Sequence, residues 1–318
     1  MGRSLERAID RVRHAEELGY DSAYVTHIAG RDSLAVAEAY AMRTERIRVG
    51  TGVLPIYSRT PVATAQTAAT IDEISMGRVV LGLGVSHRPT VEGWYGQKLE
   101  KPVRAMREYA GCVRAILHGQ DPPETERWPT QFRFMGYEAR AELPIYLAAL
   151  SPAMLRLAGE IGDGVVLWLC NHHYVRDVVV PEVTKGRERA GKPLEGFDVV
   201  AAVPAAVTED AEAARARLRA DLVPYFSLPF YRAMLERSGF GDDIAGFDAG
   251  MQKGDVDTAV GSISDEFLQT LTAIGSRDDA IASVERYREA GCTSPCVGGV
   301  PGTDFDTTLE ALSAVAGR

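Results

Sequence analysis

The chain of 318 residues has no excess of basic side chains and no long apolar run. Its formal net charge is −9 and its pI is near 5.3. Sequence-independent binding of DNA or RNA needs clustered Lys and Arg, so this charge argues against a nucleic-acid partner. The longest apolar runs resemble Val165 to Leu169, whereas a membrane helix needs roughly 20 apolar residues. We therefore expect no membrane segment. The charged, amphipathic stretch from Ser4 to Leu18 is unlike a signal peptide.

Cysteine is rare, and metal-binding patterns are absent. The four cysteines, at positions 112, 170, 292 and 296, are scattered, with no matching Cys/His pair at zinc spacing. We interpret them as reduced packing residues of a cytoplasmic protein. The ends of the predicted strands carry no Asp or Glu, and the sequence has no His-x-His pair, so a metal site is not expected.

What the chain does have is alternation of strands and helices. The predicted strands cover residues 22–28, 47–53, 78–85, 144–149, 164–169, 197–207 and 295–300. The predicted helices cover 5–18, 34–44, 60–75, 102–117, 174–189, 209–222, 277–290 and 305–316, and another begins at Ser151-Pro152. This alternation predicts βαβ units and a parallel sheet.

The pattern favours a (β/α)₈ TIM barrel in one domain over residues 1–318, with insertions at about 120–143 and 224–264. A doubly wound open sheet is the alternative, weakened because no G-x-G-x-x-G follows a strand. The chain opens with a helix, so a first strand would lie upstream of Ser4 and is absent from this sequence. The barrel would then have an open seam with two unpaired edges. We expect either poor stability or another segment in the gap.

In a TIM barrel the active site lies where strands end and βα loops begin. His27 and His87 stand at such places and could act as acid or base, although each could equally be a hydrogen-bonded loop histidine. His172 and His173 open a helix and are interpreted as solvated. The aromatic residues Trp94, Tyr95 and Trp168 could wall a pocket or simply belong to the core.

Two backbone features could hold a ligand. The turn Ala148-Ala149-Leu150-Ser151 joins a strand to a helix start, where free amides and the helix dipole suit a phosphate; Ser151 could also be only a cap. The glycines of Gly82-Leu83-Gly84 permit close approach of a flat ligand, or merely tight strand packing.

Three segments together resemble the luciferase-like monooxygenase superfamily, in its coenzyme F420-dependent oxidoreductase branch. They are TERIRVGTGVLPIYSR (44–59), QTAATIDEISMGRVVLGLG (66–84) and VSHRPTVEGWYG (85–96). The resemblance implies a bacterial luciferase-like barrel with a tricyclic ring across the strand ends. It also implies a cis peptide at Gly52-Val53 under that ring and phosphate contacts from Ala149, Leu150 and Ser151. The residues expected to bind the cofactor are Gly52, Val53, Gly84, Ser86, Ala148, Ala149, Leu150, Ser151 and Trp168.

The resemblance further implies hydride transfer between the deazaflavin F420 and a small organic substrate, with His27 and then His87 as candidate proton relays. A homodimer is expected by analogy. Some relatives place a glutamate after strand four, where this chain has Ser86 and His87. Three alternatives remain open: an FMN-dependent monooxygenase of the same fold, a catalytically inactive cofactor-binding barrel, and a phosphate-binding isomerase or lyase, for which paired carboxylates are missing.

Overall fold

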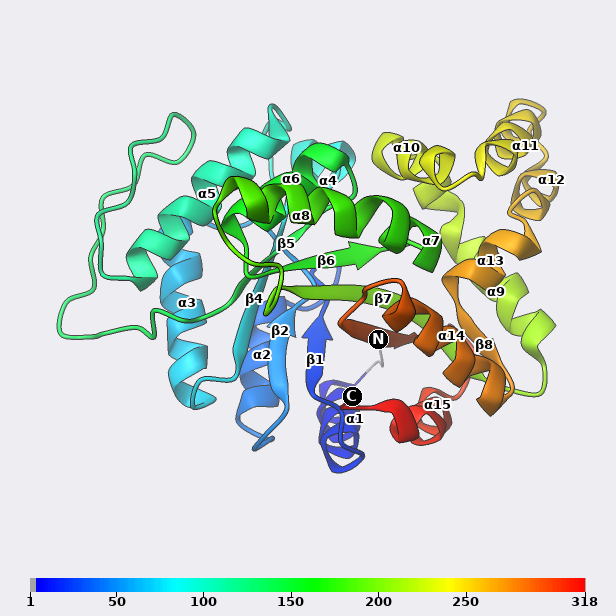
Figure 1. The fold of residues 1–318 in the computed structure, drawn as a ribbon, viewed down its shortest axis with the longest axis horizontal. Coiled ribbons are helices and arrows are strands. Elements are labelled where there is room, and N and C mark those ends of the chain that lie inside the picture. The colour runs from blue at the N-terminus through cyan, green and yellow to red at the C-terminus, as the bar shows by residue number, and fades with distance from the viewer. Residues whose placement is uncertain (1–3, 318) are drawn as a thin grey trace.

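A curved sheet of parallel strands forms the centre of the protein (Figure 1). The computed structural model describes residues 4–317. Its strands are β1 (Ser22–Val25), β2 (Arg48–Thr51), β3 (Leu54–Pro55), β4 (Val79–Gly84), β5 (Ile145–Ala148), β6 (Gly164–Trp168), β7 (Asp198–Val207), β8 (Ala273–Gly275) and β9 (Ser294–Gly299). They run in the order β1-β2-β4-β5-β6-β7-β8, with β3 also beside β4 and β9 also beside β7. All seven predicted strands are present; β3 and β8 were not predicted.

Helices cover the outer face of this sheet. They are α1 (Leu5–Glu17), α2 (Ser33–Ala41), α3 (Pro61–Ile74), α4 (Arg88–Gly93), α5 (Pro102–Leu117), α6 (Pro152–Ile161), α7 (His172–Tyr174), α8 (Val180–Arg189), α9 (Ala211–Phe226), α10 (Pro229–Arg237), α11 (Gly241–Gln252), α12 (Val256–Gly261), α13 (Asp265–Leu271), α14 (Arg277–Glu289) and α15 (Phe305–Leu312). A π-helical turn, Val175–Val179, joins α7 to α8. Within residues 4–317, no helix is both long enough and apolar enough to cross a membrane.

The helix starts follow the predicted capping chemistry. The Thr60 hydroxyl accepts a hydrogen bond from the Ala63 amide at 3.2 Å, and Pro61 opens α3. The Ser151 hydroxyl does the same for Met154 at 3.3 Å, and Pro152 opens α6. A side-chain oxygen satisfies an otherwise unpaired first-turn amide, and proline has no amide to leave unpaired. These local effects fix where the helices begin, directly after the strand ends.

The sheet separates two apolar regions. Its outer face packs against the helices in the main core. Its inner face carries a smaller cluster of Val80, Tyr146 and Val200, with Tyr24 and Cys296 packed against it. Burial on both faces explains why strands such as β6 are continuous apolar runs in the sequence.

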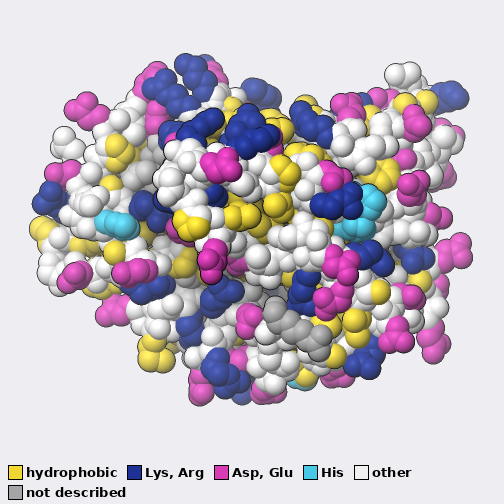
Figure 2. Space-filling model, viewed as in Figure 1, with side chains coloured by type: hydrophobic (Ala, Val, Ile, Leu, Met, Phe, Trp, Pro, Cys, Tyr) yellow, Lys and Arg dark blue, Asp and Glu magenta, His cyan; other side chains and the backbone are white. Residues whose placement is uncertain are grey.

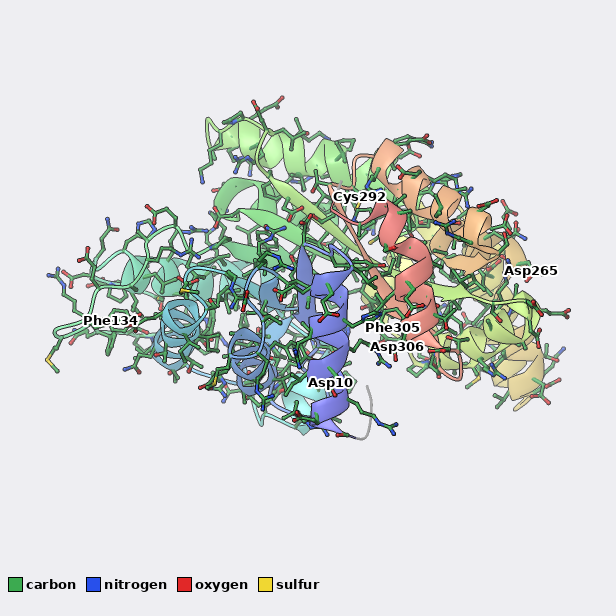
Figure 3. The ribbon with its side chains drawn as sticks, turned by 90° about the horizontal axis from the view of Figure 1, so that it is seen from below. Asp10, Phe134, Asp265, Cys292, Phe305 and Asp306 are labelled. Atoms are coloured by element: carbon green, nitrogen blue, oxygen red, sulfur yellow. The ribbon has the colours of Figure 1, made fainter. Side chains whose placement is uncertain are left out.

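The seam expected from the missing strand is present among the described residues. There β1 pairs only with β2, and β9 pairs only with β7. No described strand fills the gap; the helical layer bridges it instead. Arg11 of α1 pairs with Asp306 of α15, its guanidinium lies 5.5 Å from the Phe305 ring centre, and the Tyr20 hydroxyl donates to the Leu309 carbonyl at 2.8 Å. Figure 3 shows α1 and α15 side by side, with Phe305 and Asp306 labelled.

Two segments depart from the alternation of strands and helices. The segment 120–143 projects at one end of the molecule in Figure 1 and contains no strand. The second is more helical than expected: α9 to α13 form a lobe at the opposite end (Figure 1). Its first two helices, α9 and α10, reach back to the strand ends.

Candidate functional site

The carboxyl ends of the parallel strands meet at one rim, and the predicted site residues lie there. The bodies of β2, β4, β5 and β7 are largely buried, whereas several residues at or just beyond the strand ends are partly exposed. These partly exposed residues are His27, Gly52, Val53, Ser86, His87, Ala148, Leu150, Ser151 and Trp168. The rim is therefore the edge of the sheet that a ligand can reach.

Val53 forms an apolar floor at this rim. The Gly52–Val53 peptide is cis, as the resemblance predicts. A Cβ on Gly84 would lie 2.5 Å from Val53 Cγ2, and one on Gly82 would lie 2.0 Å from the Thr51 carbonyl oxygen. Only glycine at positions 82 and 84 lets β4 pack this closely against the Thr51 carbonyl and the Val53 side chain. Gly82 and Gly84 therefore allow the tight strand packing that was one of the two roles considered for them. This packing also fixes the position of Val53.

The turn from β5 into α6 presents free backbone amides. The Ala149 amide donates a long bond of 3.4 Å to the Val166 carbonyl. Among the described residues, no acceptor is paired with the amides of Leu150 or Ser151. The Tyr174 hydroxyl holds the Leu150 carbonyl at 2.7 Å and so fixes the turn. Free amides at the start of a ten-residue helix suit a phosphate group.

His27 follows β1 and is held by the start of α2. Its Nδ1 accepts from the Ser33 amide at 3.3 Å and lies 3.0 Å from the Ser33 hydroxyl. A nitrogen that accepts carries no proton, so the neutral ring has its proton on Nε2. Burial lowers the pKa of His27; the nearby Asp32 carboxylate opposes this and Arg59 adds to it. His27 is therefore a neutral hydrogen-bond donor at pH 7.

His87, two residues beyond β4, lies in a different setting. Its Nδ1 is buried without a hydrogen-bond partner, and its ring centre lies 5.4 Å from that of Tyr231. Burial alone lowers the pKa of His87. No described hydrogen bond or ring contact joins His87 to His27, and β2 lies between their strands. The two histidines are thus separate features of the rim.

Two non-glycine residues beside the strand ends have left-handed backbone. Ser86 has φ +58° and Leu169 has φ +59°. This conformation costs an L residue roughly 1–2 kcal/mol. Such strain tends to gather at functional sites. Here it lies at the ends of β4 and β6, on either side of the free amides that follow β5.

The model of the family described as luciferase-like monooxygenase matches residues 1–294. This chain belongs to that family. It is 31% identical over 310 residues to a 5,10-methylenetetrahydromethanopterin reductase of Archaeoglobus fulgidus, covering 95% of this chain and 92% of that protein. The structure of a coenzyme F420-dependent tetrahydromethanopterin reductase of Methanopyrus kandleri superposes with a TM-score of 0.79 at 25% identity, covering 98% of this chain and 94% of the other.

A more distant likeness shows the fold alone. The oxygenating constituent of 3,6-diketocamphane monooxygenase of Pseudomonas putida, solved in complex with FMN, superposes with a TM-score of 0.69 at 17% identity. It covers 99% of this chain and 94% of the other. The bacterial luciferase-like barrel expected from the sequence is confirmed, and the doubly wound alternative is wrong.

Two aromatic residues at the rim of this luciferase-like protein were not anticipated from its sequence. Tyr225, near the end of α9, lies 5.9 Å from Trp168 between ring centres, and Tyr231 of α10 lies 5.0 Å from Tyr225. With the contact between Tyr231 and His87, these four rings form a continuous row, which we call the aromatic arch. Tyr225 and Tyr231 come from the second insertion, whose fold no sequence period reveals.

The remaining candidate site residues are not part of the aromatic arch. His173 is exposed as expected, but His172 packs against Tyr287 at 5.9 Å, and burial lowers its pKa to about 4. Trp94 is 55% exposed and encloses no pocket by itself. Within residues 4–317, no group of His, Cys, Asp or Glu is placed to hold a metal ion.

Figure 2 shows Lys and Arg interspersed with Asp and Glu over one face.

Proposed function

We propose that this luciferase-like protein is an oxidoreductase that binds coenzyme F420 across the rim and transfers hydride to or from a small organic substrate. One observation carries the proposal: the Val53 floor and the free amides of Leu150 and Ser151 share the same rim. A flat ring with a phosphate-bearing tail needs both an apolar support and an anion site. The similarity to F420-dependent reductases favours the deazaflavin.

The residues divide the work between binding and proton handling. When bound, the deazaflavin supplies two electrons as hydride. Val53 supports the ring from below, and the amides after β5 hold the phosphate. Ala149 is buried, whereas Ala148 is partly exposed beside Gly84, which keeps this part of the rim free of large side chains.

His27 is proposed to handle the substrate oxygen. Reduction of a carbonyl adds a hydride to carbon and a proton to oxygen, and oxidation of an alcohol reverses both. In reduction, protonated His27 can give its Nε2 proton to that oxygen while Nδ1–H donates to the Ser33 hydroxyl 3.0 Å away, and in oxidation the proton returns by the same route. The ion pair of Arg59 with Asp32, at 2.7 Å, fixes the loop that carries His27.

A binding titration with each cofactor tests the proposal. F420 and FMN are titrated separately into the full chain and followed by absorbance and fluorescence. We expect F420 to bind at micromolar concentration or below, and Val53→Ala to weaken it about ten-fold by removing the support. Val178→Ala, in the outer helical layer, is the matched control and leaves the affinity unchanged. Submicromolar binding of FMN with none of F420 would instead identify an FMN-dependent monooxygenase.

A catalytically inactive barrel is distinguished by turnover. If the protein only binds the cofactor, His27→Ala changes nothing in a turnover assay with a panel of alcohols and ketones. We expect instead a loss of at least about 100-fold in kcat, the usual contribution of a positioned proton donor.

All four cysteines are free, which favours a reducing compartment such as the cytoplasm.

A further inference from the structure

The aromatic arch joins the ends of two strands at the rim. His87 follows β4 and Trp168 ends β6, and β5 lies between these strands in the sheet. Tyr231 and Tyr225 complete the row from the insertion side. The row therefore runs from the end of β4 to the end of β6 at the rim.

Two polar atoms of the arch are buried without partners: His87 Nδ1 and Trp168 Nε1. Buried polar atoms in native proteins are nearly always hydrogen-bonded, so each such atom needs an explanation. Burial raises the pKa of Tyr225, and the neighbouring Trp168 N–H opposes that rise. The Trp168 N–H nevertheless makes no hydrogen bond in the structure. An indole N–H and a phenol hydroxyl are thus close together, and the indole donor is unused.

The charge around the arch restricts what it could hold. No charged group shifts the pKa of His87. The charged neighbour that affects Tyr225 is the carboxylate of Asp221, which would repel an anion. Tyr231 is buried at 5% exposure, whereas Tyr225 is partly exposed. Tyr225 is therefore open to a ligand, as the partly exposed Trp168 and His87 are, and Tyr231 supports it from behind.

We propose that Tyr225 and Trp168 determine substrate specificity, which rests on the proposed function, and that they select an uncharged, flat carbonyl compound such as an aryl ketone. The reacting carbonyl oxygen is left to His27, as in the proposed function. The flat part of the substrate packs on the Tyr225 ring, which contacts the Trp168 ring and is held by it. Aromatic contacts of this kind discriminate by a few-fold to about ten-fold, beyond the area that they bury.

The test compares acetophenone with cyclohexyl methyl ketone, which has a similar size but no flat ring. Binding to the full chain is measured by calorimetry without coenzyme, and kcat/KM is measured with reduced F420. We expect the protein to prefer acetophenone, and Tyr225→Leu to reduce that preference about five-fold or more. Tyr225→Phe keeps the preference, because it retains the aromatic ring. Tyr137→Leu, in the other insertion, is the control and changes neither.

The outcomes separate this inference from the proposed function. If F420 does not bind but the preference for acetophenone is present and is lost in Tyr225→Leu, the proposed function fails and the specificity role stands. If F420 binds and Tyr225→Leu keeps the full preference, the specificity role is overturned and the function stands. Tyr225→Phe retains the ring contacts, so a lost preference in this variant would overturn the specificity role even if the leucine variant is less stable.

Discussion

Replacing Gly84 with Ala tests whether the floor of the rim is as tightly packed as the structure shows. The added Cβ would lie 2.5 Å from Val53 Cγ2, well inside the 3.0 Å below which such contacts essentially never occur. Val53 is β-branched, so it has few rotamers with which to move away. Overpacking of this kind typically costs about 1–3 kcal/mol. We expect Gly84→Ala to lower the free energy of unfolding by about 2 kcal/mol.

A double-mutant cycle identifies the cause of that loss. Val53→Ala removes the clashing methyl, and the nearest atoms to the new Cβ are then Ala148 Cβ at 3.4 Å and Val53 Cβ at 3.6 Å. Val53→Ala alone should cost about 1 kcal/mol, since its partly exposed side chain loses two methyl groups. The double variant should cost at least about 1 kcal/mol less than the sum of the single variants.

Urea unfolding followed by circular dichroism measures each variant at one temperature and pH. Gly93→Ala is the control, because a Cβ there meets nothing within 4 Å. It should change the free energy of unfolding by no more than about 0.5 kcal/mol. The reasoning is refuted if Gly84→Ala is equally neutral, or if the costs of Gly84→Ala and Val53→Ala simply add.

Three further predictions follow from the histidines and the seam. Because burial lowers the pKa of His27 below its ordinary 6.5, its charged form is present only at acidic pH. The pH–rate profile of substrate reduction should therefore fall as pH rises through a pKa below 6.5, and His27→Gln should abolish that inflection; an unchanged profile rules out the role. The pKa of His172 is lowered to about 4, so as pH falls below 6.5 the unfolded chain takes up a proton at His172 before the folded chain does. The contribution of neutral His172 to the free energy of unfolding is therefore full above pH 6.5 and is lost as pH falls toward 4. His172→Gln should flatten that part of the stability profile in urea titrations at a series of pH values, and an equally steep profile would contradict the assignment. Arg11 and Asp306, with side chains 35% and 51% exposed, should show a coupling energy of only about 0.5 kcal/mol in a double-mutant cycle, and less at high salt; a coupling above about 2 kcal/mol would mean that this pair holds the seam.

Features set by local chemistry could be predicted from the sequence. The prediction for α5 matches the structure at both ends, Pro102 and Leu117, since proline suits a helix start and the apolar period continues to the last turn. β8 could not be predicted, because three residues are too few to show a period. Its pairing with Ala205–Val207 of β7 depends on tertiary structure alone.

The segment 120–143 shows the same limit. The contacts that hold this insertion come from elsewhere in the fold. The Tyr137 hydroxyl donates to the Ala69 carbonyl at 2.9 Å, and the Trp128 ring meets that of Tyr109 at 5.0 Å. Such anchors fix an irregular segment without strand pairing, and no pattern within the segment reveals them.

The site divides in the same way. His27, Val53 and Leu150 could be placed because each lies at a strand end, and the carboxyl ends of parallel strands meet at one rim. Their partners Ser33 and Gly84 are near in sequence or on an adjacent strand. Tyr225 and Tyr231 could not be placed, because the path by which α9 and α10 return to the rim is a property of the whole fold. The residues proposed to set substrate preference are thus harder to read from a sequence than those proposed to hold the cofactor.

The position of the seam explains how an open barrel can still carry a complete rim. The seam lies between β1 and β9, whereas the floor and the free amides lie on β2, β4 and β5, whose neighbours are all paired. Only His27, which follows the edge strand β1, stands beside the gap, and its ring is held by Ser33 of α2. The contacts of α1 with α15 close the outer layer over the same gap. Weakening those contacts should therefore disturb proton handling by His27 before it disturbs binding of the cofactor.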